Sequence, residues 1–404
     1  MTMSNRPWES EYWNVSRMNY WPEIYGTYTI PEKVILHDAT LRDGEQSPGV
    51  VFTVEDKVAI ARQLAKIGIQ RIEAGMPAVS EQDFEAARQI AKLDLPAQIF
   101  AFSRAMPGDI EKVVASGAYG AVIKITCGET RLKCANPDWT IDDVARKSIE
   151  TIKYAKKAGL YTVYFPYDTT RSDPKYCKEL IERVCAEANP DAVTVVDTTG
   201  TATPCGIKAL VKNVKEYAGG RPVEIHTHND LGMGVANALA AVEAGAEVIH
   251  GCVNGIGERC GNASMEEIIV AAEALYGIHT GINTHLLVET CKLVEKLSGI
   301  PLSFNKPIAG AAAYMKESGV GLKTANDYPQ VTFPISEKYV GAKRKMVLGK
   351  KSGKDSIRVK LEEFHLELDE DKFPALLQDI KNLSIRERRY LTDQEFLELY
   401  DRVK

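Results

Sequence analysis

From about residue 33 onwards, the chain alternates between two patterns of hydrophobic and polar residues. Short runs rich in β-branched and apolar residues predict strands, and the longer segments between them place apolar residues every three or four positions, as on one face of a helix. The strand-like runs are VILHDAT (34–40), RIEAG (71–75), QIFAFS (98–103), AVIKIT (121–126), YTVYFPY (161–167), AVTVVDTT (192–199), VEIHTHN (223–229) and VIHGCVNG (248–255). These eight runs start about 30 residues apart, which is the length of one βα unit.

Strands that alternate with helices form parallel sheets with right-handed crossovers, so the fold is either an open doubly wound sheet or a closed barrel. Eight strands favour the barrel. The turn after the first run, LRDGEQSPG, also lacks the GxGxxG pattern of a dinucleotide-binding sheet. The predicted fold class is therefore α/β, a (β/α)8 TIM barrel with a C-terminal, mainly helical subdomain.

The alternation ends near residue 300 and divides the chain into three predicted parts. Residues 1–32 form an N-terminal arm, residues 33–300 form the barrel, and residues 301–404 form a linker and a helical subdomain. Segment 301–352 is rich in Gly, Pro and Lys and predicts irregular structure, whereas 355–404 has helical periodicity.

Composition and charge exclude several classes of protein. The 404 residues are 45% hydrophobic, and 50 basic against 55 acidic residues give a net charge of -5, which argues against a nucleic-acid binder with a broad basic face. No run approaches the length of a membrane span, and the N-terminus has no apolar signal region. The eight cysteines include no CxxC pair, so we expect reduced thiols and a cytoplasmic protein.

The N-terminal arm is unusually aromatic. It holds seven aromatic residues before position 29, and these are Trp8, Tyr12, Trp13, Tyr20, Trp21, Tyr25 and Tyr28. A disordered tail is normally poor in such side chains. We therefore expect the arm to pack on a partner subunit, in a homodimer, or across the barrel.

The strongest chemical pattern is His226-Thr227-His228 in the seventh run. Alternate residues of a strand point the same way, so both imidazoles face one side. With a nearby carboxylate they would make a ligand set for a divalent cation, and Asp43 after the first run is the best-placed carboxylate. Two hydrogen-bonded barrel histidines without a metal are the structural alternative.

Other polar residues also follow the strand-like runs, where a barrel places its active site. Arg42 could hold and polarise an oxyanion or a 2-oxo group, or it could form a salt bridge with Glu45. Thr198 could donate a hydrogen bond to a substrate carboxylate, or it could cap the following helix. Gln46 and Glu73 are further polar residues at these strand ends.

Five long motifs resemble the DRE-TIM metallolyase superfamily. They are HDATLRDGEQSPGV (37–50), IEAGMPAVSEQDFEA (72–86), DTTGTATP (197–204), HTHNDLGMGVANALAAVEAGA (226–246) and NGIGERCGNASMEE (254–267). The chain is most similar to the Claisen-condensing branch, the 2-isopropylmalate, homocitrate and citramalate synthases. The resemblance covers about residues 33–310, with a weaker echo in LGKKSGKDS (348–356).

The resemblance implies a divalent metal ion (Mn²⁺, Mg²⁺ or Zn²⁺) held by Asp43, His226 and His228, with Asn262 as a further ligand in some members. Arg42 would polarise the 2-oxo group, and Thr198 would bind the substrate carboxylate. Members of this branch condense acetyl-CoA with a 2-oxo acid and then hydrolyse the thioester. Since the chain ends at residue 404, a leucine-sensing domain and feedback by leucine are not expected.

Three segments depart from the branch pattern. Tyr167, in YFPYD, stands where branch members carry a glutamate in a segment like FSPED. KESGVG (316–321) places Lys316 and Gly321 where a segment like HESGIH carries histidines, and Thr332 or Phe333 replaces a following tyrosine. Side chains that could take over as acid or base are Tyr167, Lys316, Tyr314 and Lys323, although ordinary packing or solvated surface would explain each of them equally well.

Three functions remain open. The first is a metal-dependent acyltransferase that condenses an acyl-CoA with a 2-oxo acid. The second is a lyase with the same metal site, either an aldolase or a retro-Claisen enzyme, that acts on a hydroxy acid or a hydroxyacyl thioester. The third is a non-catalytic relative, which the retention of Arg42, Asp43, His226 and His228 disfavours. The expected ligands are thus a small anionic 2-oxo or hydroxy acid and a CoA thioester.

Overall fold

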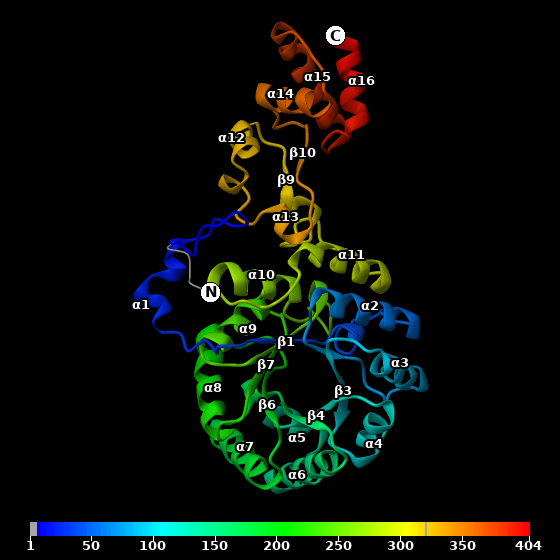
Figure 1. The fold of residues 1–404 in the computed structure, drawn as a ribbon, viewed down its shortest axis with the longest axis vertical. Coiled ribbons are helices and arrows are strands. Elements are labelled where there is room, and N and C mark those ends of the chain that lie inside the picture. The colour runs from blue at the N-terminus through cyan, green and yellow to red at the C-terminus, as the bar shows by residue number, and fades with distance from the viewer. Residues whose placement is uncertain (1–5, 320) are drawn as a thin grey trace. The chain divides into compact units, whose positions relative to one another are not determined.

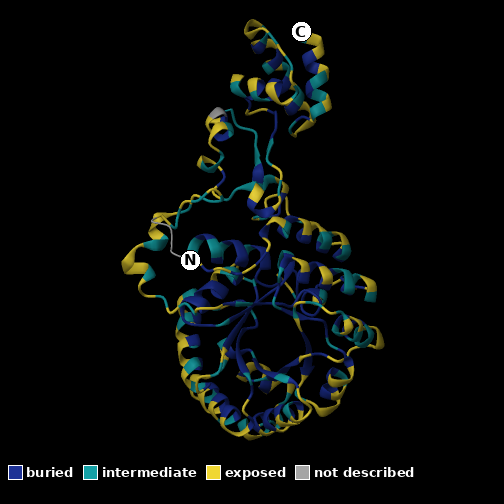
Figure 2. Ribbon diagram, viewed as in Figure 1, coloured by how far each residue is buried: buried dark blue, intermediate teal, exposed yellow. Residues whose placement is uncertain are grey.

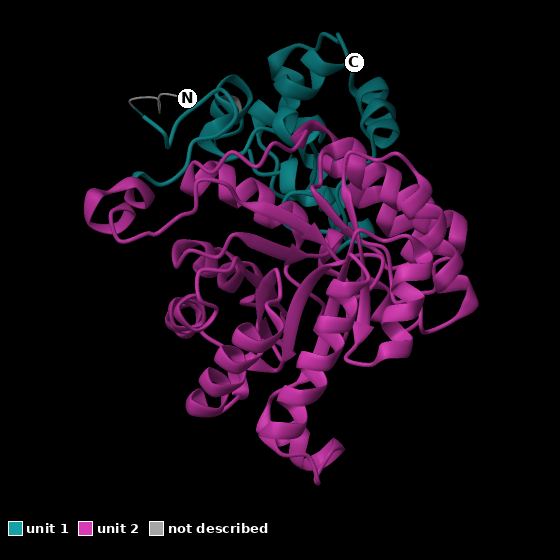
Figure 3. Ribbon diagram, turned by 60° about the horizontal axis from the view of Figure 1, so that its bottom comes forward, with its two compact units in different colours: residues 1–17, 302–404 teal, residues 18–301 magenta. Residues whose placement is uncertain are grey.

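The computed structural model describes residues 6–319 and 321–404, apart from the side chain of Lys323. The chain forms two compact units (Figure 3). The larger unit is Met18–Pro301, and the smaller one joins the residues up to Arg17 with Leu302–Lys404.

The larger unit is a closed barrel of eight parallel strands in sequential order, in which β8 pairs with β1. This confirms the predicted TIM-barrel fold. Figure 1 shows the helices as a ring outside the strands. The strands are β1 (Ile35–Asp38), β2 (Arg71–Glu73), β3 (Gln98–Arg104), β4 (Gly120–Thr126), β5 (Tyr161–Tyr167), β6 (Ala192–Asp197), β7 (Val223–Thr227) and β8 (Val248–Gly251).

The helices of this unit follow the predicted spacing. They are α1 (Pro22–Tyr25), α2 (Val54–Ile67), α3 (Glu81–Lys92), α4 (Pro107–Ser116), α5 (Glu129–Ala135), α6 (Ile141–Lys157), α7 (Pro174–Ala188), α8 (Pro204–Tyr217), α9 (Gly234–Glu243), α10 (Met265–Tyr276) and α11 (Leu287–Ser298). Helix α2 has clear ends: Thr53 caps its first turn by accepting from the Asp56 amide, and Gly68 ends it at φ 99°. A left-handed backbone conformation at this position favours glycine, because glycine has no Cβ atom that would be strained there.

The barrel interior is filled by side chains from alternate positions of its strands. Figure 2 shows the strands as buried and the outer helix surfaces as exposed. One apolar cluster consists of Phe100, Phe102, Val122, Val163, Phe165, Ala192 and Val196. This cluster includes Val122 of β4 and Phe165 of β5, so residues that share their parity along these two strands also face inward.

A buried polar group fills another part of the interior. Glu224 accepts hydrogen bonds from Arg71 at 2.7 Å and shares one with His250 at 2.8 Å. The His37 and His250 rings stack with centroids 4.1 Å apart. Burial alone would raise the pKa of Glu224, but its bond to His250 and the charge of Arg71 lower it to about 2. This carboxylate is therefore ionised and paired inside the barrel.

The aromatic arm divides between the two units. In the larger unit, Tyr20 and Tyr25 donate hydrogen bonds to the carbonyls of Ala274 and Tyr276, at 2.9 and 3.1 Å, and thereby lie on α10. In the smaller unit, the Trp13 ring packs on Tyr339 with centroids 5.5 Å apart. The arm thus packs on its own chain in both units.

The smaller unit begins irregularly and ends in packed helices. Its elements are β9 (Met315–Lys316), α12 (Leu322–Asp327), α13 (Glu337–Val340), β10 (Lys345–Met346), α14 (Lys354–Glu363), α15 (Phe373–Glu387) and α16 (Asp393–Val403). The last three helices enclose an apolar core that includes Leu361, Ile380 and Phe396. Across the described chain, every helix is too short or too polar to cross a membrane.

Candidate active site

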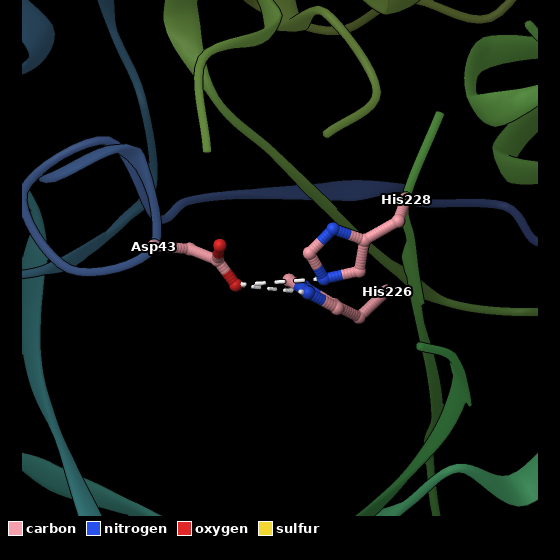
Figure 4. A group of neighbouring side chains, drawn as sticks. All are labelled: Asp43, His226 and His228. Atoms are coloured by element: carbon pink, nitrogen blue, oxygen red, sulfur yellow. Dashed lines mark ion pairs between the residues drawn. The ribbon is translucent and has the colours of Figure 1, made fainter. Parts of the chain in front are cut away.

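Asp43, His226 and His228 meet at the mouth of the barrel. Asp43 lies in the loop after β1, where its amide donates to the carbonyl of Ala39 at 2.8 Å. His226 is on β7 and His228 follows it, so both rings extend from the same side of the strand. The Nε2 atoms lie 3.3 Å (His226) and 3.8 Å (His228) from Asp43 Oδ2, and Figure 4 shows the carboxylate pointing toward both rings.

The protonation states of these residues suit metal binding. Burial lowers the pKa of His226 to about 3 and also lowers the pKa of His228, so both imidazoles are neutral at pH 7. Burial opposes the charge of Asp43, but Arg42 and the two histidines hold the pKa of its carboxyl well below its usual range. Two neutral imidazoles and a carboxylate are the deprotonated donors that a divalent cation requires.

The donor atoms of these three residues lie within 4.8 Å of one another. The Nδ1 atoms of His226 and His228 are buried and have no hydrogen-bond partner within the described part of the chain. Their Nε2 atoms face Asp43, which is itself a candidate ligand. The geometry and the donor chemistry both fit a metal ion.

Arg42 is fixed by two carboxylates. It donates to both oxygens of Glu73, at 3.0 and 3.2 Å, and its Nη1 donates to Asp43 Oδ2 at 2.6 Å. The predicted alternative, a salt bridge with Glu45, is wrong because Glu45 pairs with Lys57 instead. Only 7% of Arg42 is exposed, so its guanidinium stays oriented toward the cavity.

Asn262 completes the surroundings of Asp43. Its Nδ2 donates to Asp43 Oδ1 at 3.1 Å, while its Oδ1 is buried without a partner among the described residues. Gly257 has φ 151°, and a Cβ there would collide with the amide of Asn262. The loop after β8 therefore needs a glycine at this position so that Asn262 can reach the site.

The triad lines a cavity of about 520 Å³ that lies within the larger unit. Its lining residues are Arg42, Asp43, Gln46, Pro48, Phe102, Lys124, Arg131, Phe165, Tyr167, Arg171, Val196, Thr198, Thr199, His226, His228, Glu258 and Arg259. Of the expected substrate-binding residues, Gln46 and Thr198 are in this lining. Glu73 is fully buried outside this lining and accepts hydrogen bonds from Arg42, so it positions Arg42, while its expected contact with a substrate stays a prediction.

Thr198 is oriented by a backbone contact. Its hydroxyl oxygen accepts from the Asp168 amide at 2.9 Å, which leaves the hydroxyl hydrogen available for a ligand in the cavity. The predicted alternative, a cap on the following helix, is wrong because Thr203 caps α8.

Tyr167 lies in the cavity wall, and two cations that sequence reasoning missed contact its ring. Lys124 Nζ is 4.2 Å from the ring centroid, and Arg131 Cζ is 4.8 Å from it. Arg131 also donates to the phenol oxygen at 3.3 Å. The sequence did contain a signal for Lys124. It is the one charged residue in the apolar run AVIKIT, and it faces the same side of the strand as Val122.

The remaining predicted acid–base residues belong to the smaller unit. Lys316 lies on β9, and Tyr314 is the residue just before this strand. Burial raises the pKa of the Tyr314 phenol. The side chain of Lys323 lies outside the described part of the structure. The roles of Lys316, Tyr314 and Lys323 stay predictions.

Two family models match the chain. Residues 33–294 match the HMGL-like family, and residues 308–388 match the homocitrate synthase post-HMGL domain-like family. The chain is 40% identical to a "Probable 2-isopropylmalate synthase" of Ignicoccus hospitalis, with 93% of each chain covered. It is also 40% identical to "Homocitrate synthase AksA" of Methanopyrus kandleri, with 92% of each chain covered.

Among solved structures, the HMG-CoA lyase of Bacillus subtilis superposes with a TM-score of 0.60 at 22% identity, covering 68% of this chain and 96% of that one. At this identity the likeness concerns the barrel fold. The range matched by the HMGL-like family includes Arg42, Asp43, His226 and His228. The chain therefore belongs to the HMGL-like (DRE-TIM) family and carries a homocitrate synthase post-HMGL domain-like segment after its barrel.

Proposed function

We propose that the chain condenses an acyl-CoA, with acetyl-CoA as the expected donor, with a 2-oxo acid at a divalent metal ion. The observation that carries this proposal is the convergence of Asp43, His226, His228 and the buried Arg42 on one cavity. Relatives named as 2-isopropylmalate and homocitrate synthases support it, since they match over nine-tenths of the chain.

In this reaction the acetyl methyl group loses a proton and forms a carbon–carbon bond with the carbonyl carbon of the 2-oxo acid. The carbonyl oxygen becomes a hydroxyl group, and water then hydrolyses the thioester to release the CoA thiol. A metal ion held by Asp43, His226 and His228 would act as a Lewis acid on the 2-oxo acid.

The residues of the chain supply orientation and charge. Arg42, held by Glu73, presents a fixed positive charge to the oxygen that becomes negative in the transition state. Thr198 can donate its hydroxyl hydrogen to the carboxylate of the acid, and Gln46 lies in the same wall. These groups need no rearrangement before the reaction, because their own contacts already fix Arg42 and Thr198.

The methyl proton needs a base, and Tyr167 and Lys316 are the proposed acid–base residues. Burial raises the pKa of Tyr167, so its phenol is protonated at neutral pH and serves best as a proton donor. This favours a second candidate function, a lyase with the same metal site, since a donor at this place could protonate the carbanion that carbon–carbon cleavage leaves.

A thiol-release assay separates these functions. The protein is mixed with Mn²⁺ or Mg²⁺, acetyl-CoA and a panel of 2-oxo acids, and free CoA thiol is followed with time. We expect release that depends on both the metal and one class of 2-oxo acid. Release that ignores the acid, or no release with any acid, would contradict the condensation.

Two further results point elsewhere. Cleavage of hydroxy acids, or of hydroxyacyl thioesters, with no requirement for acetyl-CoA would establish the lyase. A protein that binds no metal and turns over none of these compounds would be a non-catalytic relative.

A further inference from the structure

The proposed condensation needs a base for the methyl proton, and few of the side chains that line the cavity can act as one. Arginines stay protonated. Among the described residues of the lining, the other ionisable side chains are Asp43, Lys124, Tyr167, His226, His228 and Glu258. Asp43 and the two histidines are the proposed metal ligands, which use their lone pairs for the metal ion. Tyr167 is protonated at neutral pH, because burial raises the pKa of its phenol.

Glu258 and Lys124 are left, and they differ in their partners. The Glu258 carboxylate pairs with Arg259 at 3.2 Å, and 46% of its side chain is exposed to solvent. An exposed carboxylate that is bound to a guanidinium is a weak base. Among the residues that the structure describes, no carboxylate forms an ion pair with Lys124, and its Nζ lies over the Tyr167 ring, 4.2 Å from the centroid.

Lys124 faces the cavity from the same part of the wall as the metal triad. In the barrel register it pairs with Phe165 on β5, and the Phe165 ring lies 5.4 Å from the ring of His226. Arg42 and Thr198 line the same cavity of about 520 Å³. An acid that binds at the triad and at these two residues therefore leaves the neighbouring wall at Lys124 for the acetyl group of the thioester.

The surroundings of Lys124 make its amine available as a base. Burial, with Arg131 and Arg42 nearby, lowers the pKa of Lys124 to about 8, so a fraction of the amine is neutral at pH 7. Arg104, its register neighbour on β3, is bound to Asp109 at 2.8 Å. The face of the Tyr167 ring stabilises the ammonium group that proton transfer creates. The charged and titratable groups that face Lys124 are Arg131 on α5, Tyr167 on β5, Arg42 and Asp43 after β1, and Glu258 after β8.

We propose that Lys124 is the catalytic base, whose Nζ removes a proton from the methyl group of the acyl-CoA. The proposal rests on the function proposed above. As the C–H bond breaks, its electron pair forms the bond from the methyl carbon to the oxo carbon of the acid, and the oxo oxygen gains a negative charge. That oxygen takes a proton from water, Lys124 releases its own proton to the solvent, and hydrolysis of the thioester frees the CoA thiol.

The first test is the pH dependence of kcat in the Mn²⁺-loaded full chain, with acetyl-CoA and the 2-oxo acid that supports thiol release. With both substrates saturating, kcat should rise about tenfold between about pH 7 and about pH 9, because the neutral amine is the active form. Saturation separates this effect from binding of the acid, which the protonated form of Lys124 favours.

Substitutions separate a base from a positive charge. Lys124→Arg keeps the charge but holds its proton throughout this pH range, so kcat should fall about 100-fold or more and should no longer rise with pH. The matched control is Lys133→Arg, since Lys133 is exposed on α5 and pairs with Glu129 at 3.5 Å. Its kcat should equal that of the unaltered protein.

Added amines test the same point in Lys124→Ala, whose smaller side chain leaves room for them. The condensation product is followed by mass spectrometry, because amines also cleave thioesters directly. Methylamine should restore product formation at least about tenfold, whereas tetramethylammonium, which has a charge but no lone pair, should restore none. If Lys124→Ala does not fold, the comparison of Lys124→Arg with its control decides.

Three results would overturn the proposal. If Lys124→Arg keeps its kcat within about threefold and shows the same rise with pH, the base lies elsewhere while the condensing function stands. If methylamine restores no more product formation than tetramethylammonium does, Lys124 does not act through its lone pair. If the unaltered protein forms no product with any 2-oxo acid, the proposed function fails and this inference fails with it.

Discussion

Asp43 connects the groups of the site through its two carboxylate oxygens. Oδ2 faces Arg42 and both histidines, and Oδ1 accepts from Asn262. One side chain thereby joins the loop after β1, the end of β7 and the loop after β8. Such sharing makes its position strongly determined, because moving it would break contacts to several separate segments at once.

The first prediction concerns the second histidine. His228→Ala should lower the affinity for Mn²⁺ by about 100-fold or more, because it removes one of three protein donors. Metal content after dialysis, measured by mass spectrometry, checks this. The control is His279→Ala, since His279 is exposed and far from the triad in sequence. A variant of His228 that keeps its full metal content and activity would refute the ligand assignment.

The second prediction is a pH dependence of binding. Burial, with Arg131 and Arg42 nearby, lowers the pKa of Lys124 to about 8. Lys124 is protonated below this value and neutral above it, so the Kd of an anionic acid should rise about tenfold between about pH 7 and about pH 9. The charged and titratable groups that act on Lys124 are Arg131, Tyr167, Arg42, Asp43 and Glu258.

Titration calorimetry across this range checks the pH dependence, with Lys124→Met as the reference. In that variant the Kd should stay flat up to pH 9, because Arg131 keeps its charge. A dependence that persists without Lys124 would assign the titration to another group.

Among the elements, β7 has two roles on its inward face. Glu224 is bound to Arg71 and His250 inside the barrel, and His226 stands two residues later at the mouth. The same strand thus carries an internal ion pair and a ligand of the site. Because a strand is stiff, a change at the Glu224 ion pair is expected to shift the position of His226.

Glu224→Gln should lower the free energy of unfolding by about 3–5 kcal/mol, because it leaves the charge of Arg71 buried without its partner. Urea unfolding at pH 7 measures this, with the exposed Glu216→Gln as control. The pKa of Glu224 is lowered, so its stabilisation is present above about pH 4.5 and is lost as the pH falls toward 2. Equal unfolding midpoints for the two variants would contradict this.

The elements were largely predictable from the sequence, and the reasons are local. The run YTVYFPY corresponds to β5 because its residues favour strands and turn signals end it on both sides. Strand ends were less predictable: the run 248–255 contains β8 only to Gly251, since Asn254 adopts φ 62° in a turn. A tight turn that contains apolar residues cannot be told from a continuing strand by its hydrophobic pattern.

The parts of the site that were predictable are those formed by residues close together in the sequence. His226 and His228 could be predicted as a pair because the parity of a strand puts them on one side. The bond from Arg42 to Glu73 joins residues on different strands, so only the closed barrel shows it. Lys124 was missed because the apolar run around it outweighed a single charge.

At the scale of the whole molecule, the N-terminal arm contributes to both units. Trp13 packs on Tyr339, and the backbone of Asn14 donates to Pro334 at 2.9 Å. The smaller unit is therefore built from both ends of the chain. The homodimer expected from the sequence stays a prediction, which sedimentation equilibrium would check.

Trp13→Ala should loosen the smaller unit and leave the barrel intact, because Trp13 packs on Tyr339 within the smaller unit. Hydrogen exchange should become faster in peptides that cover residues 334–340 and stay unchanged in peptides from β7. Trp21→Ala is the matched control, since 49% of Trp21 is exposed. If both variants exchange as the unaltered protein does, the arm contributes nothing to this unit.

Tyr167 also limits how the chain could be converted into its relatives. A glutamate at this place would lie close to Lys124 and Arg131 and pair with them instead of remaining free to take a proton. A designer who places a glutamate here to gain a base would therefore also have to replace Lys124 and Arg131, since these two cations would hold its charge.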